Sequence, residues 1–233
     1  MKETIVSDIM NSPRAPMILE ELQQAWAKEQ LRRPRFYEEM NEEQKAEFIQ
    51  GEVIVHSPAR KRHLDAAGNI YKLLDLYVKR HQLGEVFSEK ALIQLTRNDF
   101  EPDVCFFTLE RSEQFEEDQL FFPAPDLVVE VLSDSTKHRD WGVKLEDYQL
   151  HGVEEYWIVD AQQKVIEQYH LEDGQYQLIT KSREGNVHSF AIQHLVLPIS
   201  AIFDEKALMQ FIASLFSQLF LSTPVGASCC QVE

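Results

Sequence analysis

The sequence predicts a mixed α/β domain, in which helices pack against a mixed central β-sheet and a C-terminal antiparallel meander follows. The order of the patterns is the first reason. A helix, a hairpin and a longer helix precede apolar strand-like runs, a further helix and alternating strands. Composition is the second reason, because 44% hydrophobic and 27% charged residues are ordinary for a chain with a buried core. The 233 residues fit one domain with terminal extensions.

The first third of the chain is expected to hold an extension, a hairpin and a long helix. Residues 1–35 form the expected extension, with a helix over about 19–30. Residues 47–56 are predicted to form two short strands around a Gln50-Gly51 turn. A helix is predicted over about 61–82, because apolar residues recur there at helical spacing. These residues are Leu64, Ala67, Ile70, Leu73, Leu74, Tyr77 and Val78.

The remaining patterns set the expected domain boundaries. Strands are predicted over 85–95, 103–108, 127–133, 155–160, 165–170, 176–180 and 189–192. A helix of about 140–151 separates the third and fourth of these strands, and Gly152 ends it. We expect a main domain over 36–205, a C-terminal helix over 206–221 and a disordered tail over 222–233.

The chain is acidic, with a formal net charge of −16 from 39 Asp and Glu against 23 Lys and Arg. Such a field repels phosphate backbones, so nonspecific nucleic-acid binding should be weak. A nuclease is not excluded, because a bound cation offsets the charge of a carboxylate-rich metal site. The best candidate for a local basic patch is Arg60-Lys61-Arg62-His63.

Several classes of protein are disfavoured. No apolar run reaches membrane-spanning length, and the first residues lack the apolar core of a signal peptide. Cys105 and the Cys229-Cys230 pair make no disulfide framework, so we expect a cytoplasmic protein without a membrane partner. The sequence has no Walker loop, Gly-rich dinucleotide turn, nucleophile elbow or HExxH motif, which argues against common nucleotide-binding and peptidase functions.

Two carboxylates stand near the ends of separate apolar strands. Asp103 begins one strand, and Glu130 lies inside a Val/Leu run that should be covered on both faces. An unpaired charge in such a strand is costly. A divalent cation, a nearby lysine or a proton held by a raised pKa must therefore compensate Glu130.

This pattern suits metal-dependent phosphodiester cleavage. Mg²⁺ is usually held by one or two carboxylates with waters, and a nearby lysine stabilises transition-state charge. Asp103 and Glu130 are candidate ligands, with the Val131 carbonyl as a further one. Lys144 lies 14 positions after Glu130 on the next predicted helix and reaches the carboxylates if that helix folds back over the strand end.

The residues alone leave alternatives open. Glu130 also fits a paired strand-end carboxylate with no catalytic role. Lys144 also fits a solvated helix face, and Lys137 is a rival lysine on the preceding loop. His63 suits a phosphate contact and a plain surface position equally.

A family resemblance rests on a block of motifs between residues 125 and 160. The block is Pro125-Asp126-Leu127-Val128-Val129-Glu130-Val131-Leu132-Ser133, then Thr136, Arg139-Asp140, Lys144, Tyr148, Gly152-Val153 and Glu155-Tyr156-Trp157-Ile158-Val159-Asp160. Upstream similarities are Glu47-Phe48-Ile49-Gln50-Gly51-Glu52, His63 and Glu101-Pro102-Asp103-Val104. With these motifs the chain resembles the Uma-type restriction endonuclease family, of the PD-(D/E)XK nuclease-like superfamily, over roughly residues 36–203.

The resemblance implies a restriction-endonuclease-like fold and a metal-dependent endonuclease that hydrolyses DNA phosphodiester bonds. It implies that Asp103 and Glu130 are catalytic acids that bind Mg²⁺ or Mn²⁺, and that Lys144 replaces the motif lysine. It also places Glu52 and Glu47 near the same site.

One departure separates the chain from the usual motif. An E-x-K motif would place a lysine at position 132, where this chain has Leu132. Migration of the lysine to the helix explains this, and so does loss of activity. The alternative function is therefore an inactive nuclease-like fold that serves as a binding or assembly module. A hydrolase of small phosphorylated or acidic substrates is a third candidate, and cutting both strands of a duplex would favour a homodimer.

Overall fold

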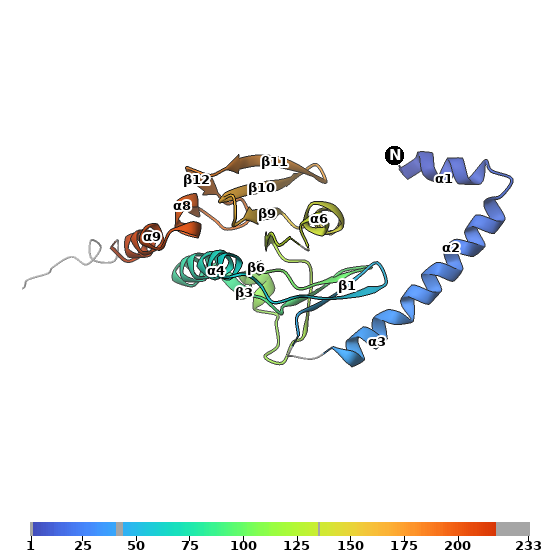
Figure 1. The fold of residues 1–233 in the computed structure, drawn as a ribbon, viewed down its shortest axis with the longest axis horizontal. Coiled ribbons are helices and arrows are strands. Elements are labelled where there is room, and N and C mark those ends of the chain that lie inside the picture. The colour runs from blue at the N-terminus through green and yellow to red at the C-terminus, as the bar shows by residue number, and fades with distance from the viewer. Residues whose placement is uncertain (1, 41–43, 135, 218–233) are drawn as a thin grey trace, which may run out of the picture.

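The computed structural model describes residues 2–40, 44–134 and 136–217, and a six-stranded mixed sheet forms its centre (Figure 1). The strand order is β11-β10-β9-β8-β6-β3. The bounds are β3 (Gly84–Ser88), β6 (Val104–Thr108), β8 (Leu127–Val131), β9 (Glu155–Asp160), β10 (Val165–Glu172) and β11 (Gln175–Ser182). β8 and β9 are parallel and the other neighbours antiparallel. The expected mixed sheet and the β9–β11 meander are confirmed.

The two faces of this sheet bury different side chains, because successive residues of a strand point to opposite faces. Val129 and Val131 of β8 join the core under α4 (Lys61–His81). Val128 joins a second core on the opposite face, together with Tyr148 of α7 (Leu145–Leu150). Glu130 alternates with Val129 and Val131, so it belongs to this second face.

Helix α4 supplies the first core from the stripe that its sequence predicts. α8 (Ile199–Phe203) and α9 (Glu205–Ser217) pack against α4 in Figure 1 and in their contacts. Leu64 is the exception to the predicted stripe, because it is 50% exposed and the buried residues begin at Ala66.

A second, five-stranded sheet covers the other face, and the sequence did not predict it. Its order is β2-β1-β5-β4-β7. The bounds are β1 (Ala46–Ile49), β2 (Glu52–Val55), β4 (Leu92–Gln94), β5 (Asp99–Phe100) and β7 (Phe121–Phe122). The predicted strand over 85–95 was wrong in extent. Glu89 and Lys90 both have positive φ, which turns the chain between β3 in one sheet and β4 in the other.

The N-terminal segment forms a helical arm beside the second sheet (Figure 1). It comprises α1 (Lys2–Met10), α2 (Ala15–Gln30) and α3 (Arg32–Glu39). Two ion pairs attach it to the body: Arg33 to Asp99 at 2.6 Å and Glu29 to Arg97 at 2.7 Å. No residue of α2 is buried, and its apolar side chains Met17, Leu22 and Trp26 are each about half exposed.

The remaining elements are short. They are α5 (Leu109–Ser112), α6 (Lys137–Arg139), the π-helix η1 (Asp140–Lys144), β12 (Asn186–His188) and β13 (Val196–Pro198). The predicted tail and Cys229-Cys230 lie outside the described residues. Among the helices that the structure describes, none has the length and apolar character needed to cross a membrane.

The predicted strand over 189–192 was also wrong, because those residues form a loop around a buried carboxylate. Glu155 of β9 accepts hydrogen bonds through Oε2 from Ser189 Oγ and from the N–H groups of Phe190 and Ala191. Its Oε1 accepts from Trp157 Nε1 and Gln168 Nε2. This carboxylate therefore holds the loop against the central sheet.

Replacing Glu155 with alanine should destabilise the fold, because two buried and three partly buried donors would lose their acceptor. We expect the Glu155→Ala variant to lose about 3 kcal/mol or more of unfolding free energy. Urea denaturation followed by circular dichroism measures this loss. The control is Glu154→Ala, which changes the neighbouring exposed residue. Equal urea midpoints for the two variants would contradict the role of Glu155 in holding the loop.

Candidate active site

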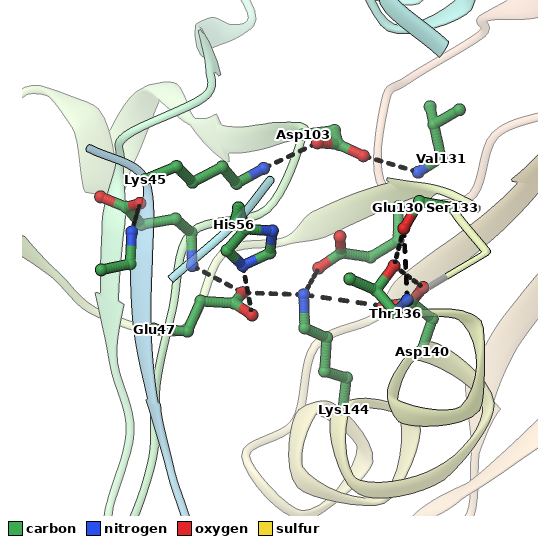
Figure 2. Close-up of polar contacts among 12 residues, drawn as sticks. Lys45, Glu47, His56, Asp103, Glu130, Val131, Ser133, Thr136, Asp140 and Lys144 are labelled. Carbon is green, nitrogen blue, oxygen red and sulfur yellow. Dashed lines mark hydrogen bonds and ion pairs between the residues drawn. The ribbon is translucent and has the colours of Figure 1, made fainter. Parts of the chain in front are cut away.

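Asp103 and Glu130 come together because β6 and β8 are antiparallel neighbours. Val104 pairs with Val129, so the residue before β6 lies beside the end of β8. Asp103 Oδ2 accepts a hydrogen bond of 2.8 Å from the N–H of Val131 (Figure 2). Both carboxylates are buried, each 3% exposed. The structure thus joins the two predicted acids, and Val131 meets Asp103 through its N–H group.

Lys144 enters the same place from the helix that follows β8. Its Nζ lies 2.8 Å from Glu130 Oε1, 2.8 Å from Glu47 Oε1 and 3.7 Å from Asp140 Oδ1 (Figure 2). Only 1% of Lys144 is exposed, so it does not belong to a solvated helix face. Lys137, the rival lysine, is exposed.

The helix delivers Lys144 through an irregular turn. Residues 140–144 contain a kink between two helical turns, because Gly142 has the non-helical angles φ −110° and ψ −108°. Asp140 begins this segment, and its Oδ2 accepts from Thr136 Oγ1 at 3.1 Å. Asp140 is one of the residues that carry the family resemblance, but it was assigned no role from the sequence, although its spacing of four from Lys144 places both on one helix face.

Glu47 reaches the site from the second sheet. It lies on β1, is 1% exposed, and its Oε2 lies 3.0 Å from His56 Nε2. Its Oε1 accepts from the N–H of Glu101 at 3.1 Å. The structure therefore brings Glu47 into contact with Lys144, whereas Glu52 lies exposed on β2.

Glu52 lines a separate cavity of about 450 Å³. The other lining residues are Ile49, Gln50, Ile54, His138, Arg139 and Val143. In the hairpin, Glu52 is paired with Ile49 and Ile54 with Glu47. The cavity therefore lies on the same face of the hairpin as Glu47, beside α6 and η1.

A second lysine was missed from the sequence. Lys45 Nζ lies 2.7 Å from Asp103 Oδ1, and His63 Nε2 lies 3.4 Å from the same oxygen. Lys45 and Glu47 are two residues apart at the start of β1, so strand periodicity could have placed them on one face. Nothing local in the sequence shows that this face meets Asp103.

The surrounding cations decide which carboxyls ionise. Burial raises the pKa of Glu47, but Lys144 and His56 outweigh burial and bring that pKa to about 2. Burial likewise opposes ionisation of Asp103, whereas Lys45 and His63 hold its pKa below the usual value.

Glu130 behaves in the opposite way. Its burial, with repulsion from the neighbouring acids Asp140, Asp103 and Glu47, raises its pKa well above the usual value despite Lys144. Burial lowers the pKa of Lys144, but the surrounding carboxylates more than offset this, so the ammonium stays protonated. Added positive charge would therefore favour ionised Glu130.

The donor set fits a hard divalent cation in chemical type. Asp103 and Glu130 supply carboxylate oxygens, which Mg²⁺ accepts in ones or twos with waters. Asp140 Oδ1 is buried without a hydrogen-bond partner, which leaves a further acceptor at this place. Among the residues described, no three Asp, Glu, His or Cys side chains form a ready metal cage. Lys45 and Lys144 contact these carboxylates instead, so a cation would have to share or replace those contacts.

Comparison with known proteins identifies the family of this chain. The family model Uma2, described as "Putative restriction endonuclease", matches residues 29–200, and the chain therefore belongs to this family. A crystal structure described as a putative nuclease belonging to DUF820, from Anabaena variabilis ATCC 29413, is similar in fold. Its TM-score is 0.63 at 19% identity, over 74% of this chain and 96% of that chain. No curated protein matches this chain.

The pKa of Glu47 predicts acid sensitivity. Because that pKa falls from 4.5 to about 2 on folding, the unfolded chain binds more protons in this window, and Glu47 loses its stabilising effect as pH falls. Glu47→Gln should therefore lose less unfolding free energy than the parent between pH 5 and 3, by about 1–3 kcal/mol. Urea denaturation in EDTA at several pH values measures the slopes. The exposed control Glu146→Gln should keep the parent's slope, and a parental slope in Glu47→Gln would overturn the prediction.

Proposed function

We propose that this protein is a metal-dependent endonuclease that hydrolyses DNA phosphodiester bonds with Asp103, Glu130 and Lys144. The observation that supports this proposal best is the 2.8 Å contact between Lys144 Nζ and Glu130 Oε1. Lys144 on the helix thus provides the positive charge that a lysine at position 132 of the strand would provide in an E-x-K motif. Family membership indicates a nuclease-like protein, and the proposal adds the substrate, the metal and the residue roles.

Each residue has a distinct part in the proposed reaction. Asp103, Glu130 and the Val131 carbonyl would hold Mg²⁺ or Mn²⁺. The ion, when bound, would acidify a water molecule and neutralise phosphate charge. Lys144 would direct its ammonium at the charge that develops on the phosphate oxygens.

Other side chains would position these groups. Glu47 holds the Lys144 ammonium, and His56 in turn contacts Glu47. Lys45 and His63 hold the Asp103 carboxylate from the side of β1 and α4. Glu52 faces the neighbouring cavity, where it would lie beside a substrate and not among the acids. A homodimer and a cytoplasmic location remain predictions from the sequence.

A specific observation favours the alternative function, an inactive binding or assembly module. Lys45 and Lys144 already neutralise Asp103 and Glu130 through contacts of 2.7 and 2.8 Å. A fold that has exchanged its metal for lysines would keep this cluster for stability alone. Calorimetric titration with Mn²⁺ separates the two functions, because the module should not bind the ion at this cluster.

Glu130→Gln should keep the fold and abolish metal-dependent cleavage, since the amide keeps the shape but removes the anionic ligand. A plasmid-nicking assay with Mn²⁺, together with calorimetric titration, measures cleavage and binding. The matched control is Glu146→Gln, which changes an exposed carboxylate on α7. Full activity in Glu130→Gln would refute the assignment, and absence of both Mn²⁺ binding and nicking in the parent would favour the module.

Lys144→Ala should lower turnover at least about 100-fold while Mn²⁺ affinity changes much less, because the lysine acts on the transition state. Single-turnover nicking and calorimetric titration measure the two quantities. Removing a buried charge endangers folding, so Lys144→Arg serves as a second variant that keeps the charge. The control is Lys72→Ala, which removes an exposed lysine of α4, and Lys137→Ala is measured beside it as the rival lysine. Parental turnover in Lys144→Ala, or a loss confined to Lys137→Ala, would contradict the role of Lys144.

A further inference from the structure

Two short basic segments stand out against the acidic chain. In the first segment, Arg60 immediately precedes α4, and Lys61 and Arg62 are its first two residues. The second segment, Lys137-His138-Arg139, forms α6. All of these residues except the half-buried Arg139 are exposed. With a net charge of −16, the rest of the surface is a poor match for a phosphate backbone. A phosphate-binding surface therefore requires a local excess of basic side chains such as these.

The structure brings the two segments together, although they are far apart in sequence. Arg60 Nη2 lies 3.2 Å from Asp134 Oδ2, and Asp134 is three residues before Lys137. Three residues span at most about 11 Å, so the segments are close neighbours. Duplex DNA carries about one negative charge per 1.7 Å of its axis, so this span faces several phosphates.

Both segments also lead directly into the candidate active site. His63, in the first turn of α4, lies 3.4 Å from Asp103 Oδ1. Arg139 immediately precedes Asp140, and Lys144 contacts Glu130 one turn later. Arg139 and His138 further line the cavity of about 450 Å³ on the Glu47 face of the hairpin. A backbone held by these segments would therefore pass close to Asp103 and Glu130.

The acidic neighbours do not cancel this charge. Arg60 is paired with Asp134 and Lys61 with Asp65 at 2.5 Å, and the side chains of both pairs are at least half exposed. Exposed ion pairs contribute little, about 0–1 kcal/mol. Phosphates can therefore replace Asp65 and Asp134 as partners of these basic residues.

We propose that Arg60-Lys61-Arg62 and Lys137-His138-Arg139 form one contact surface for the sugar-phosphate backbone of duplex DNA, on either side of Asp134. This inference rests on the proposed endonuclease function and names the surface that presents the substrate to it. The surface acts through charge, without reading the base sequence.

The test is the salt dependence of binding to a fluorescein-labelled 20-base-pair DNA duplex, measured by fluorescence anisotropy on the full chain in EDTA. Lys61→Gln/Lys137→Gln removes two exposed charges. The slope of log K against log salt should fall in magnitude by about 1.8, and binding should weaken about tenfold or more at 0.1 M salt. Asp134→Asn should act in the opposite direction and tighten binding several-fold.

The matched control is Lys72→Gln/Lys79→Gln, which changes the net charge equally on the same helix. Lys79 lies 18 residues after Lys61, or about 27 Å along α4. The control should keep the parental slope. Equal slopes for the two double variants would contradict the proposed surface. The proposal would also fail if the parent bound no DNA duplex, or bound only an RNA duplex.

The nicking assay separates this inference from the proposed function. If the parent cleaves DNA and Lys61→Gln/Lys137→Gln binds DNA as tightly as the parent, the proposed surface is wrong and the endonuclease function is still supported. Binding that follows the predicted slopes, with no cleavage under any metal condition, would support the surface and count against the catalytic function.

Discussion

The contact between Lys144 and Glu130 is the interaction on which the rest of the structure depends. Glu130 lies in a strand that is covered on both faces, where an uncompensated charge would cost several kcal/mol. The cation that compensates it comes from η1, and the same ammonium also contacts Glu47 on β1. One buried charge therefore links the central sheet, the following helix and the second sheet. The second sheet therefore contacts the rest of the domain through this charge as well as through apolar side chains.

The lysine beside Glu130 is defined by its place in the folded structure and not by its position in the usual motif. An E-x-K lysine would approach from the same strand as Glu130, but Leu132 occupies that place and packs against the second core. The kinked segment of residues 140–144 brings Lys144 to Glu130 from the helix that follows the strand. The cluster thus keeps a cation beside the carboxylate, although the cation comes from a different element.

The lysines beside the buried acids also explain how an acidic protein can hold a cluster of carboxylates in its interior. Each of the two acids that the family resemblance identifies has its own lysine, Lys45 at Asp103 and Lys144 at Glu130. These pairs stabilise the cluster without a bound ion, and the same carboxylate oxygens suit a divalent cation. The raised pKa of Glu130 indicates that its positive partners do not fully offset burial and repulsion. The cluster therefore still favours additional positive charge.

The sequence by itself determined the local elements and the main acids. Helical spacing over 61–81, the Gln50-Gly51 turn and the apolar run around Glu130 are set by short-range periodicity, and the motifs identified the family. Only the tertiary structure decided which charges meet. Lys45 and Asp103 are separated by 58 residues, and their contact depends on the packing of two sheets. The division of 85–95 between those sheets was likewise invisible to periodicity, because both halves contain strand-favouring apolar residues and the chain turns through the positive φ angles of Glu89 and Lys90. Local patterns report which side chains are buried, whereas the pairing of buried charges depends on long-range contacts that no short window of sequence contains.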